Sequence, residues 1–469
     1  MSVLWTDAQE KTLPAAGRQR GKARFCEMTI QEIKDILAAA GTVGAGGAGF
    51  PTGFKLAEGA DTLIINAAEC EPLLYTDYVL MKRHMDRVTG GAELMMEAAG
   101  IKRGYLGVKK HTAERLGLVH DQPLSEHIRV YALPDVYPMG DEIILIYEVL
   151  RRVVQPGSLP LSAGVLVFNV ETLCNVYKAV NDGVPVTEKW VTLGGKIDHP
   201  VVVKVPVGTK VSTLLEKHHI TVPEDCVLLD GGPAMGPVID PDKAVITKTT
   251  KGLLVLPREI PAVVSKLSPM RVQLNRATSA CCQCTLCTEM CPRALIGYPL
   301  KPHKTVRSVS AFVTEDPSDY LSAALCCSCG VCELMACCQG ISPRRVYQEI
   351  KAEMAKNGLR YQYKGQNPVD PERDNRMVPV ERFKQRIGVA PFDRVAEFEH
   401  SDGWKPDTIV LPLKQHVGAP AAPLVKAGDT VAAGQMVAGA AKGISASIHS
   451  SIAGRVVSVD NNGIVISRS

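Results

Sequence analysis

CCQCTLCTEMCP, residues 281–292, dictates how the centre of this chain folds. Its cysteines Cys281, Cys284, Cys287 and Cys291 follow the spacing C-x2-C-x2-C-x3-C-P, which is typical of ferredoxin-type 4Fe–4S sites. A tight loop with this spacing turns three thiolates onto three irons of one cube. The stretch therefore predicts an iron–sulfur cluster within a small helical domain.

A second set of cysteines has nearly the same spacing: Cys326, Cys329, Cys332 and Cys337. In paired motifs the fourth cysteine ligates the other cluster. The two sets therefore predict two neighbouring 4Fe–4S clusters, with Cys291 completing the second and Cys337 completing the first. The alternative is a pair of structural zinc sites, but zinc ligands normally form two well-separated pairs.

Eleven of the 15 cysteines lie between Cys281 and Cys338. Three of them stand directly beside predicted ligands and are expected to pack as small apolar side chains near the clusters: Cys282, Cys327 and Cys338. Cys338 occupies the position where proline is usual, so Cys337 is favoured as the ligand and Cys338 is the alternative. The four scattered cysteines are expected to be small buried residues: Cys26, Cys70, Cys174 and Cys226.

Upstream of the cysteines, helices alternate with strands. Thr29 and Glu32 form a capping-box pattern ahead of a helix, and apolar runs at 62–65 and 165–168 predict buried strands. A further helix is expected after Gly140-Asp141-Glu142. The pattern predicts an α/β domain over residues 28–183.

The remaining chain divides by composition. Residues 184–262 carry short valine-rich strands (201–205, 226–229, 253–256) and a helix near 211–218, which predict a small α+β module. The cysteine domain spans 263–363 and closes with a helix capped by Ser342 and started by Pro343. Residues 364–405, rich in Pro, Arg and Asp, are expected to be a linker, and 406–469 a small all-β domain. Residues 1–27 are expected to be a flexible basic arm.

Composition excludes several classes of protein. The 469 residues are 46% hydrophobic and 22% charged, as in folded globular proteins, and the net charge of +4 is too small to indicate nucleic-acid binding. No run of 18 apolar residues is present, so no membrane span is expected. Residues 1–27 lack the apolar core of a signal peptide. We therefore expect reduced thiols that bind metal rather than disulfides.

The glycine loop Gly44-x-Gly46-x-x-Gly49 follows a helix instead of a strand, which argues against a Rossmann dinucleotide site. Its backbone N–H groups are nevertheless suited to surround a phosphate, with Lys55 as a nearby positive charge.

Four segments together carry a family resemblance: GAGGAGFPTGFK (44–55), NAAECEP (66–72), GDE (140–142) and NVET (169–172). They resemble the flavin- and NADH-binding subunit of complex I and the C subunit of the Rnf complex. The resemblance implies that FMN is held or framed by Gly44, Gly46, Gly47, Gly49, Lys55, Asn66, Glu69, Glu71, Asn169 and Thr172. It places Phe50 and Glu142 on the nucleotide side. Ala45 and Ala68 stand where complex I has arginine and aspartate.

Domain order narrows the resemblance. DGGPAMG (230–236) resembles part of the β-grasp module of this family, and residues 406–469 resemble its barrel-sandwich hybrid domain. A flavin domain, a β-grasp module, a di-cluster domain and then a terminal hybrid barrel is similar to the corrinoid reductases of propanediol-utilisation microcompartments. The expected fold class is therefore a multidomain α/β and α+β chain.

The resemblance implies electron transfer from NADH through FMN and two 4Fe–4S clusters to cobalamin, in support of adenosylcobalamin regeneration for a diol dehydratase. Implied partners are a corrinoid or cob(I)alamin adenosyltransferase and microcompartment shell proteins, and the implied location is the bacterial cytoplasm, inside or attached to a microcompartment. No catalytic acid or base is assigned, because hydride transfer to a flavin requires none. The alternatives are an Rnf-like subunit that feeds a protein acceptor such as ferredoxin, and a non-catalytic electron relay.

Overall fold

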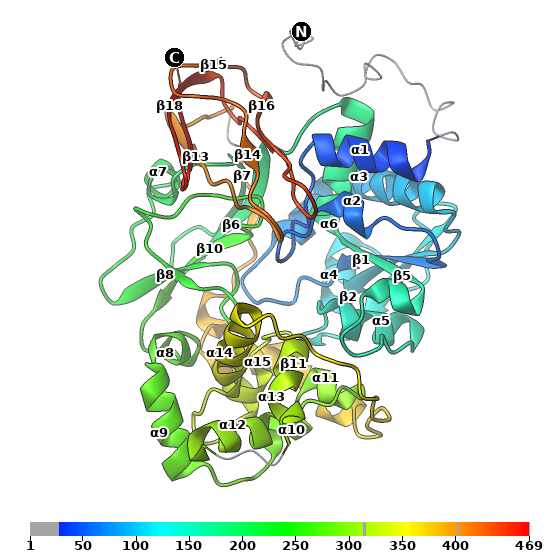
Figure 1. The fold of residues 1–469 in the computed structure, drawn as a ribbon, viewed down its shortest axis with the longest axis vertical. Helices are drawn as coiled ribbons and strands as arrows, with labels where there is room; N and C mark the ends of the chain where they lie inside the picture. The colour runs from blue at the N-terminus through cyan, green and yellow to red at the C-terminus, as the bar shows by residue number, and fades with distance from the viewer. Residues whose placement is uncertain (1–27, 313–315, 401–402, 469) are drawn as a thin grey trace.

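The computed structural model describes residues 28–312, 316–400 and 403–468 (Figure 1). The expected basic arm and Cys26 lie outside the described residues. None of the described helices is both long and apolar enough to cross a membrane.

The N-terminal part is a four-stranded parallel sheet covered by helices, with strand order β3-β2-β1-β5. Its strands are β1 (Thr62–Ala67), β2 (Gly104–Lys109), β3 (Ile128–Leu133) and β5 (Val165–Asn169), with the short β4 (Val136–Tyr137) outside the sheet. Its helices are α1 (Ile30–Ala39), α2 (Thr52–Lys55), α3 (Thr76–Ala99), α4 (Lys110–Leu116), α5 (Glu142–Leu150) and α6 (Val170–Tyr177), with short turns η2 (Pro160–Ala163) and η3 (Lys178–Asp182).

The predicted elements of this part are confirmed. Thr29 and Glu32 form the capping box at the start of α1, and Asp141 caps α5. Leu63, Ile64 and Ile65 are fully buried, because helices cover both faces of a parallel sheet. Since β1 and β5 pair in parallel, with the Cα atoms of their last shared residues Asn66 and Asn169 in register, the loops that follow both strands meet at one edge.

A mixed six-stranded sheet follows, with strand order β12-β7-β6-β10-β8-β9. The strands are β6 (Glu188–Gly195), β7 (Val201–Pro206), β8 (Cys226–Asp230), β9 (Val238–Ile239), β10 (Gly252–Pro257) and β12 (Glu397–Phe398). Helix α7 (Val211–Lys217) packs Val211 and Leu214 into the core of this module. The three predicted strands and the predicted helix are confirmed, whereas the β-grasp assignment stays a prediction.

The cysteine region is helical. Its elements are α8 (Pro261–Leu267), α9 (Met270–Ala280), α10 (Leu286–Glu289), α11 (Pro292–Leu295), α12 (Pro302–Ala311), α13 (Ser318–Leu321), η4 (Ser322–Leu325), η5 (Cys332–Ala336) and α14 (Pro343–Lys356). Helix α14 begins at Pro343 as predicted, but the side chain of Ser342 makes no capping hydrogen bond. The Ser342 amide instead donates to Gln273 Oε1, 3.0 Å away on α9.

The linker prediction for residues 364–405 is wrong. This segment contains η6 (Asp374–Arg376), β11 (Val378–Pro379), α15 (Val380–Ile387), η7 (Ala390–Phe392) and β12. Strand β11 pairs with β4 of the N-terminal part, and β12 pairs with β7 of the mixed sheet. The composition concealed a short amphipathic helix, because Val380, Phe383 and Ile387 lie on one buried face among charged residues.

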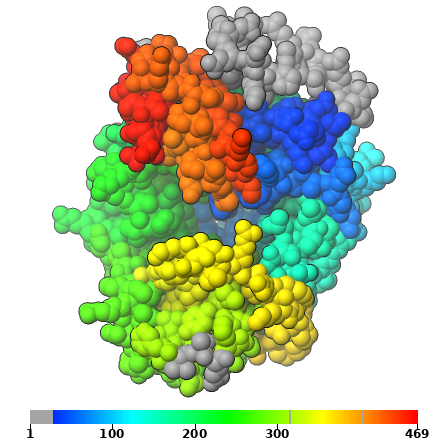
Figure 2. All heavy atoms as spheres, viewed as in Figure 1, coloured from blue at the N-terminus to red at the C-terminus, as the bar shows by residue number. Residues whose placement is uncertain are grey.

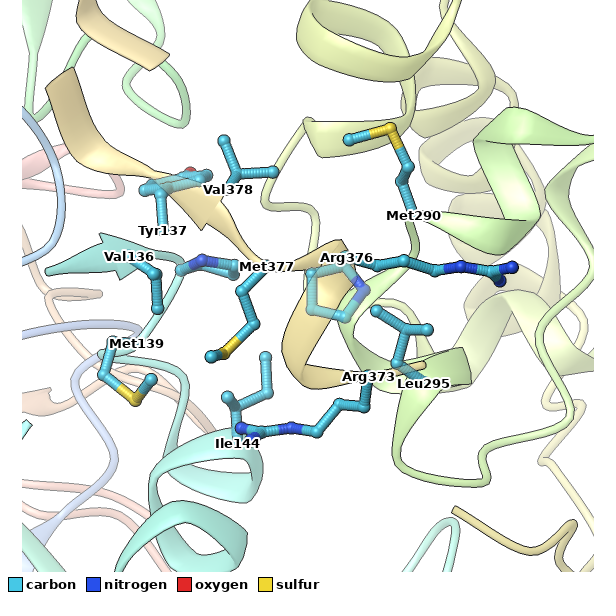
Figure 3. Close-up of a pocket in the computed structure, with 12 residues that line it drawn as sticks. Val136, Tyr137, Met139, Ile144, Met290, Leu295, Arg373, Arg376, Met377 and Val378 are labelled. Atoms are coloured by element: carbon cyan, nitrogen blue, oxygen red, sulfur yellow. The ribbon is translucent and has the colours of Figure 1, made fainter. Parts of the chain in front are cut away.

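The same segment is packed tightly against the N-terminal part. The Phe383 ring stacks on Tyr137, with centroids 4.1 Å apart, and Arg373 forms a buried ion pair with Glu148 at 2.6 Å. Figure 3 shows Met377 and Val378 between β4 and the helices of the cysteine region. The cavity left there is only about 20 Å³, which is room for about one water molecule. The segment therefore fastens the N-terminal part to the cysteine region.

The C-terminal part is all-β, as predicted. Two small sheets, β13-β19-β18-β15 and β14-β16-β17, enclose one apolar core. Their strands are β13 (Thr408–Leu411), β14 (Ala422–Pro423), β15 (Thr430–Val431), β16 (Met436–Gly439), β17 (Ile448–His449), β18 (Gly454–Asp460) and β19 (Gly463–Ser467). This barrel lies at the opposite end of the molecule from α9 and α12 (Figure 1).

A buried lysine joins three parts of the chain. Lys248 Nζ donates to the carbonyl oxygens of Gly41 (2.7 Å) and Ser447 (2.6 Å), so it links the mixed-sheet module to the N-terminal part and to the barrel. Burial lowers the pKa of Lys248 from 10.5 to about 7. A neutral amine has two hydrogens, which matches these two acceptors.

This lysine predicts a pH-dependent stability. Between pH 7 and 10.5 the unfolded chain retains a proton that folded Lys248 has released, so stability rises with pH across this window. From pH 7.5 to 9.5 we expect this group to add about 2 kcal/mol to the free energy of unfolding. Urea unfolding at both pH values measures the rise. In Lys248→Met the rise should shrink by that amount, and an equal rise in variant and wild type would contradict the prediction.

Candidate functional site

The largest cavity, about 820 Å³, lies at the carboxyl ends of β1 and β5. In Figure 2 the surface is hollowed where the blue and teal N-terminal segment meets the orange barrel and the yellow segment. The cavity is lined by all twelve residues predicted to hold FMN or NADH: Gly44, Gly46, Gly47, Gly49, Phe50, Lys55, Asn66, Glu69, Glu71, Glu142, Asn169 and Thr172. The structure thus brings these residues together, and their individual ligand roles stay predictions.

The glycine loop is fixed by its own end and by α6. Gly44 N donates to Phe50 O at 2.9 Å, and Ala45 N donates to Thr172 Oγ1 at 3.0 Å. A Cβ on Gly46 would lie 2.8 Å from the Asn169 side chain, so only glycine fits there without displacement. Within the described residues, the amides of Gly46 and Gly47 donate to no protein acceptor. Two free amides facing a cavity fit a phosphate group.

A network of buried polar groups lies below the loop. Lys251 Nζ is 2.6 Å from Asp77 Oδ2 and 3.5 Å from Glu69 Oε1, and Asn169 Nδ2 donates to Asp77 Oδ2 at 2.9 Å. Burial opposes the charge on Lys251, yet Asp77 and Glu69 raise its pKa. Burial raises the pKa of Glu69. Asp77 Oδ1 is buried and has no partner within the described residues, which leaves one acceptor for a ligand in the cavity.

Sequence analysis missed Asp77 and Lys251. Neither residue belongs to a recognised motif, and they are 174 residues apart in the chain. Only the fold brings the start of α3 next to the loop before β10, so no local pattern could have paired them.

Glu71 joins the cavity to two other parts of the chain. It accepts hydrogen bonds from the amides of Ala234 (2.9 Å) and Met235 (3.1 Å), and burial raises its pKa. A Cβ on Gly232 would lie 2.0 Å from Glu71 Oε2, which explains the glycine there. The Tyr137 hydroxyl lies 3.1 Å from Glu71 Oε1 and 2.7 Å from Cys329 O. Glu71 thus links the DGGPAMG loop and, through Tyr137, the second cysteine set.

A second buried pair supports the glycine loop from behind. Lys189 and Glu171 form an ion pair in which each side chain is only 1% exposed. Lys189 Nζ also donates to Ala45 O at 3.2 Å, and Trp190 N donates to Glu171 Oε1 at 3.2 Å. Glu171 belongs to the NVET segment, but Lys189 carried no sequence signal.

The predicted cysteine ligands gather in two groups that exchange their fourth members. The electrostatic neighbours of the Cys287 thiol are Cys337, Cys281 and Cys284, and burial together with these thiols raises its pKa to about 12. Cys291 lies instead beside Cys326. This is the exchange expected for two adjacent clusters, and the ligand assignment itself stays a prediction.

The second group has the same composition as its motif predicts. Burial raises the pKa of Cys332, whose neighbours include Cys326 and Cys291. Cys329 has Cys291 and Cys332 among its neighbours. Both Cys329 (7% exposed) and Cys332 (8% exposed) are buried. Buried, converging thiols fit a metal cluster better than they fit isolated side chains.

The packing prediction for two of the three adjacent cysteines is wrong. Cys282 and Cys338 are exposed, with Sγ atoms 3.9 Å apart, and the ligand atoms of both lie within 4.8 Å of Cys284. The loops that carry them point toward solvent, so no apolar core is available to them. Cys338 therefore stays the alternative ligand to Cys337. Cys327 is half-buried and lines the cavity.

The scattered cysteines differ from one another. Cys174 and Cys226 are buried, as predicted. Cys70 is only half-buried and lines the cavity, where burial of its thiol raises the pKa to about 11.

The cavity also reaches the second cysteine group. Cys327, Cys329 and Arg293 line it together with the glycine loop. Arg293 is fixed by Asp141 at 2.7 Å and by the carbonyl oxygen of Leu325 at 2.7 Å. A ligand in the cavity therefore lies against the loop that carries the second set of thiolates.

Comparison with protein-family models finds three matches. The Nuo51 FMN-binding domain matches residues 37–178, a 4Fe-4S dicluster domain matches 280–342, and the RnfC barrel sandwich hybrid domain matches 397–467. The chain therefore combines flavin-binding, iron–sulfur and hybrid-barrel domains.

Comparison with curated proteins finds relatives over nearly the whole chain. The chain is 38% identical to the cobalamin reductase PduS of Salmonella typhimurium over 442 residues, which cover 94% of this chain and 97% of the relative. It is 38% identical to PduS of Citrobacter freundii over 440 residues, or 93% and 97%. The C subunit of the Na⁺-translocating ferredoxin:NAD⁺ oxidoreductase complex of Acetobacterium woodii is 30% identical over 272 residues, or 57% and 59%.

Proposed function

Since this chain belongs to the family of the PduS cobalamin reductases, we propose that it passes electrons from NADH through FMN and two 4Fe–4S clusters to cobalamin. The family and the domain matches make it a flavin and iron–sulfur oxidoreductase. One observation carries the proposal: a single cavity is lined both by the glycine loop and by Cys329 of the second cysteine group.

The cavity residues fit FMN. The free amides of Gly46 and Gly47, with Lys55 nearby, would hold the phosphate. Lys55 is itself positioned by Glu142, 3.2 Å away. Bound FMN accepts a hydride from NADH and can return the electrons singly, as iron–sulfur clusters require.

The polar network orients the site without acting as acid or base. Asn66 Nδ2 donates to Gly140 O at 2.9 Å, which fixes the loop before α5 against the end of β1. Asn169 is held by Asp77 and in turn caps α6 through the Glu171 amide. These contacts fix the loops at the edge of the sheet, so a flavin and a nicotinamide would meet in a defined geometry.

The cluster order follows from the position of the cysteines. The second group lies beside the cavity, so it would receive electrons first. The first group, with exposed Cys284, would receive them next and deliver them outward. Reduced cobalamin would then serve an adenosyltransferase that regenerates adenosylcobalamin for a diol dehydratase, in or on a bacterial microcompartment.

An anaerobic assay tests the proposal. Protein loaded with FMN and clusters is mixed with NADH and hydroxocobalamin, and the cobalt spectrum is followed. We expect cobalt reduction that depends on both NADH and FMN. Bleaching of flavin and clusters with cobalt left oxidised would contradict cobalamin as acceptor and would favour the Rnf-like alternative, in which a protein such as ferredoxin takes the electrons. No bleaching by NADH would favour a relay that binds no nicotinamide.

A further inference from the structure

The two cysteine groups differ in exposure. The second group is buried beside the cavity, whereas Cys282, Cys284 and Cys338 of the first region are exposed. Leu286, in the same loop, is 38% exposed. The first group thus lies at a surface at the end of the molecule opposite the barrel, where Figure 1 shows α9, α10 and α12.

Helix α12 runs alongside the first cysteine loop. Thr278 Oγ1, before the loop, donates to Ser310 O at 3.3 Å, and Thr288 Oγ1, after it, is 2.6 Å from His303 Nδ1. The two ends of α12 are therefore fixed to the two ends of the loop. Its inner residues Thr305 and Val306 are buried, while Lys304 and Arg307 are exposed.

This region carries a large excess of positive charge. Between residues 263 and 312 the only acidic residue is Glu289, against seven basic ones: Lys266, Arg271, Arg276, Arg293, Lys301, Lys304 and Arg307. We define the cationic face as the four exposed members on α9 and α12 that lack a carboxylate in ion-pair contact among the described residues: Arg271, Arg276, Lys304 and Arg307. Arg276 Nη1 donates to Gly340 O at 3.4 Å, two residues from Cys338.

Exposed cations elsewhere are often paired. Lys82 pairs with Glu397 at 2.9 Å, Lys196 with Asp225 at 2.8 Å, and Arg129 with Asp121 at 3.2 Å. The cationic face surrounds the exposed thiols without such partners. Unpaired charge of one sign around a redox centre attracts an oppositely charged protein and speeds its association.

We propose that the cationic face docks an acidic surface of an electron-accepting protein and so directs electrons out through the first cluster. The inference rests on the proposed function, because it requires a cluster at the first cysteine group. Leu286 and Phe312, which is 93% exposed, supply apolar contact next to the charges.

The test compares two four-residue charge reversals. The first changes the cationic face: Arg271→Glu, Arg276→Glu, Lys304→Glu and Arg307→Glu. The matched control makes the same change in charge on exposed lysines in or next to the C-terminal barrel: Lys405→Glu, Lys414→Glu, Lys426→Glu and Lys442→Glu. Each full-length protein, with its clusters reduced chemically beforehand, is mixed with oxidised cytochrome b5, an acidic one-electron acceptor, or with cytochrome c, a basic one.

At low ionic strength we expect reversal of the cationic face to slow cytochrome b5 reduction at least about tenfold and to speed cytochrome c reduction. Both effects should fade in high salt, because salt screens the charges. Equal rates in wild type and variant, or equal effects of the two reversals, would overturn the proposal. Chemical reduction makes the result independent of NADH and FMN, so failure of the docking proposal and failure of the proposed function are distinguishable.

Discussion

Replacing Cys291 with alanine is expected to destroy the cluster bound by Cys326, Cys329 and Cys332, and to leave the cluster of its own motif in place. The reason is geometric, since Cys291 lies next to Cys326 in the fold, whereas Cys337 lies next to Cys287. Iron content should fall from about eight to about four atoms per chain. NADH-driven cobalamin reduction should fall at least about 100-fold, because the lost cluster is the one beside the cavity, while NADH still bleaches the flavin.

Electron paramagnetic resonance of the reduced protein identifies the surviving cluster. Cys291→Ala should give the spectrum of Cys326→Ala and differ from Cys284→Ala. Cys174→Ala, a buried cysteine outside both groups, is the control and should keep all iron. A spectrum of Cys291→Ala that matches Cys284→Ala would show that the fourth cysteines are not exchanged.

The cysteine spacing was informative because cluster ligation is a local property. Three thiolates within seven residues must turn onto one cube, whatever the rest of the fold does. The same locality explains why the capping box of Thr29 and Glu32 was predictable. It also explains the error at Cys282 and Cys338, since spacing contains no information on which side of a loop faces solvent.

The cavity was predictable as a set of residues and not as a network. Parallel strands place the loops after Asn66 and Asn169 at one edge, so motifs distant in sequence had to meet. The residues that support them come from other elements, such as Lys251 beneath Asp77. Such pairings depend on the packing of whole domains and leave no periodic pattern in the sequence.

The segment over 364–405 illustrates the opposite error. Its proline and charge content is typical of a linker, yet β11, α15 and β12 fix three parts of the chain together. A helix of eight residues buries only a few side chains, so composition averaged over 42 residues hides it. The relative position of the flavin cavity and the second cysteine group depends on this segment through Phe383 and Tyr137.

Lys189→Met is expected to destabilise the chain by about 3–5 kcal/mol, because it leaves the Glu171 carboxylate buried without its counter-charge. The variant also removes the hydrogen bond from Lys189 Nζ to Ala45 O behind the glycine loop. We therefore expect FMN to be lost more readily than from the wild type. Urea unfolding of the FMN-free protein measures the stability, and FMN fluorescence after gel filtration measures retention.

The double variant Lys189→Met with Glu171→Met separates charge burial from loop support. Replacing both members of a buried ion pair with apolar residues of similar size is often neutral, so stability should largely return. FMN retention should stay below wild type, because neither methionine can donate to Ala45 O or accept from Trp190 N. If Lys189→Met were as stable as wild type, Glu171 would have to be neutral or hydrated in the folded chain. If the double variant bound FMN like the wild type, the lysine would have no part in holding the loop.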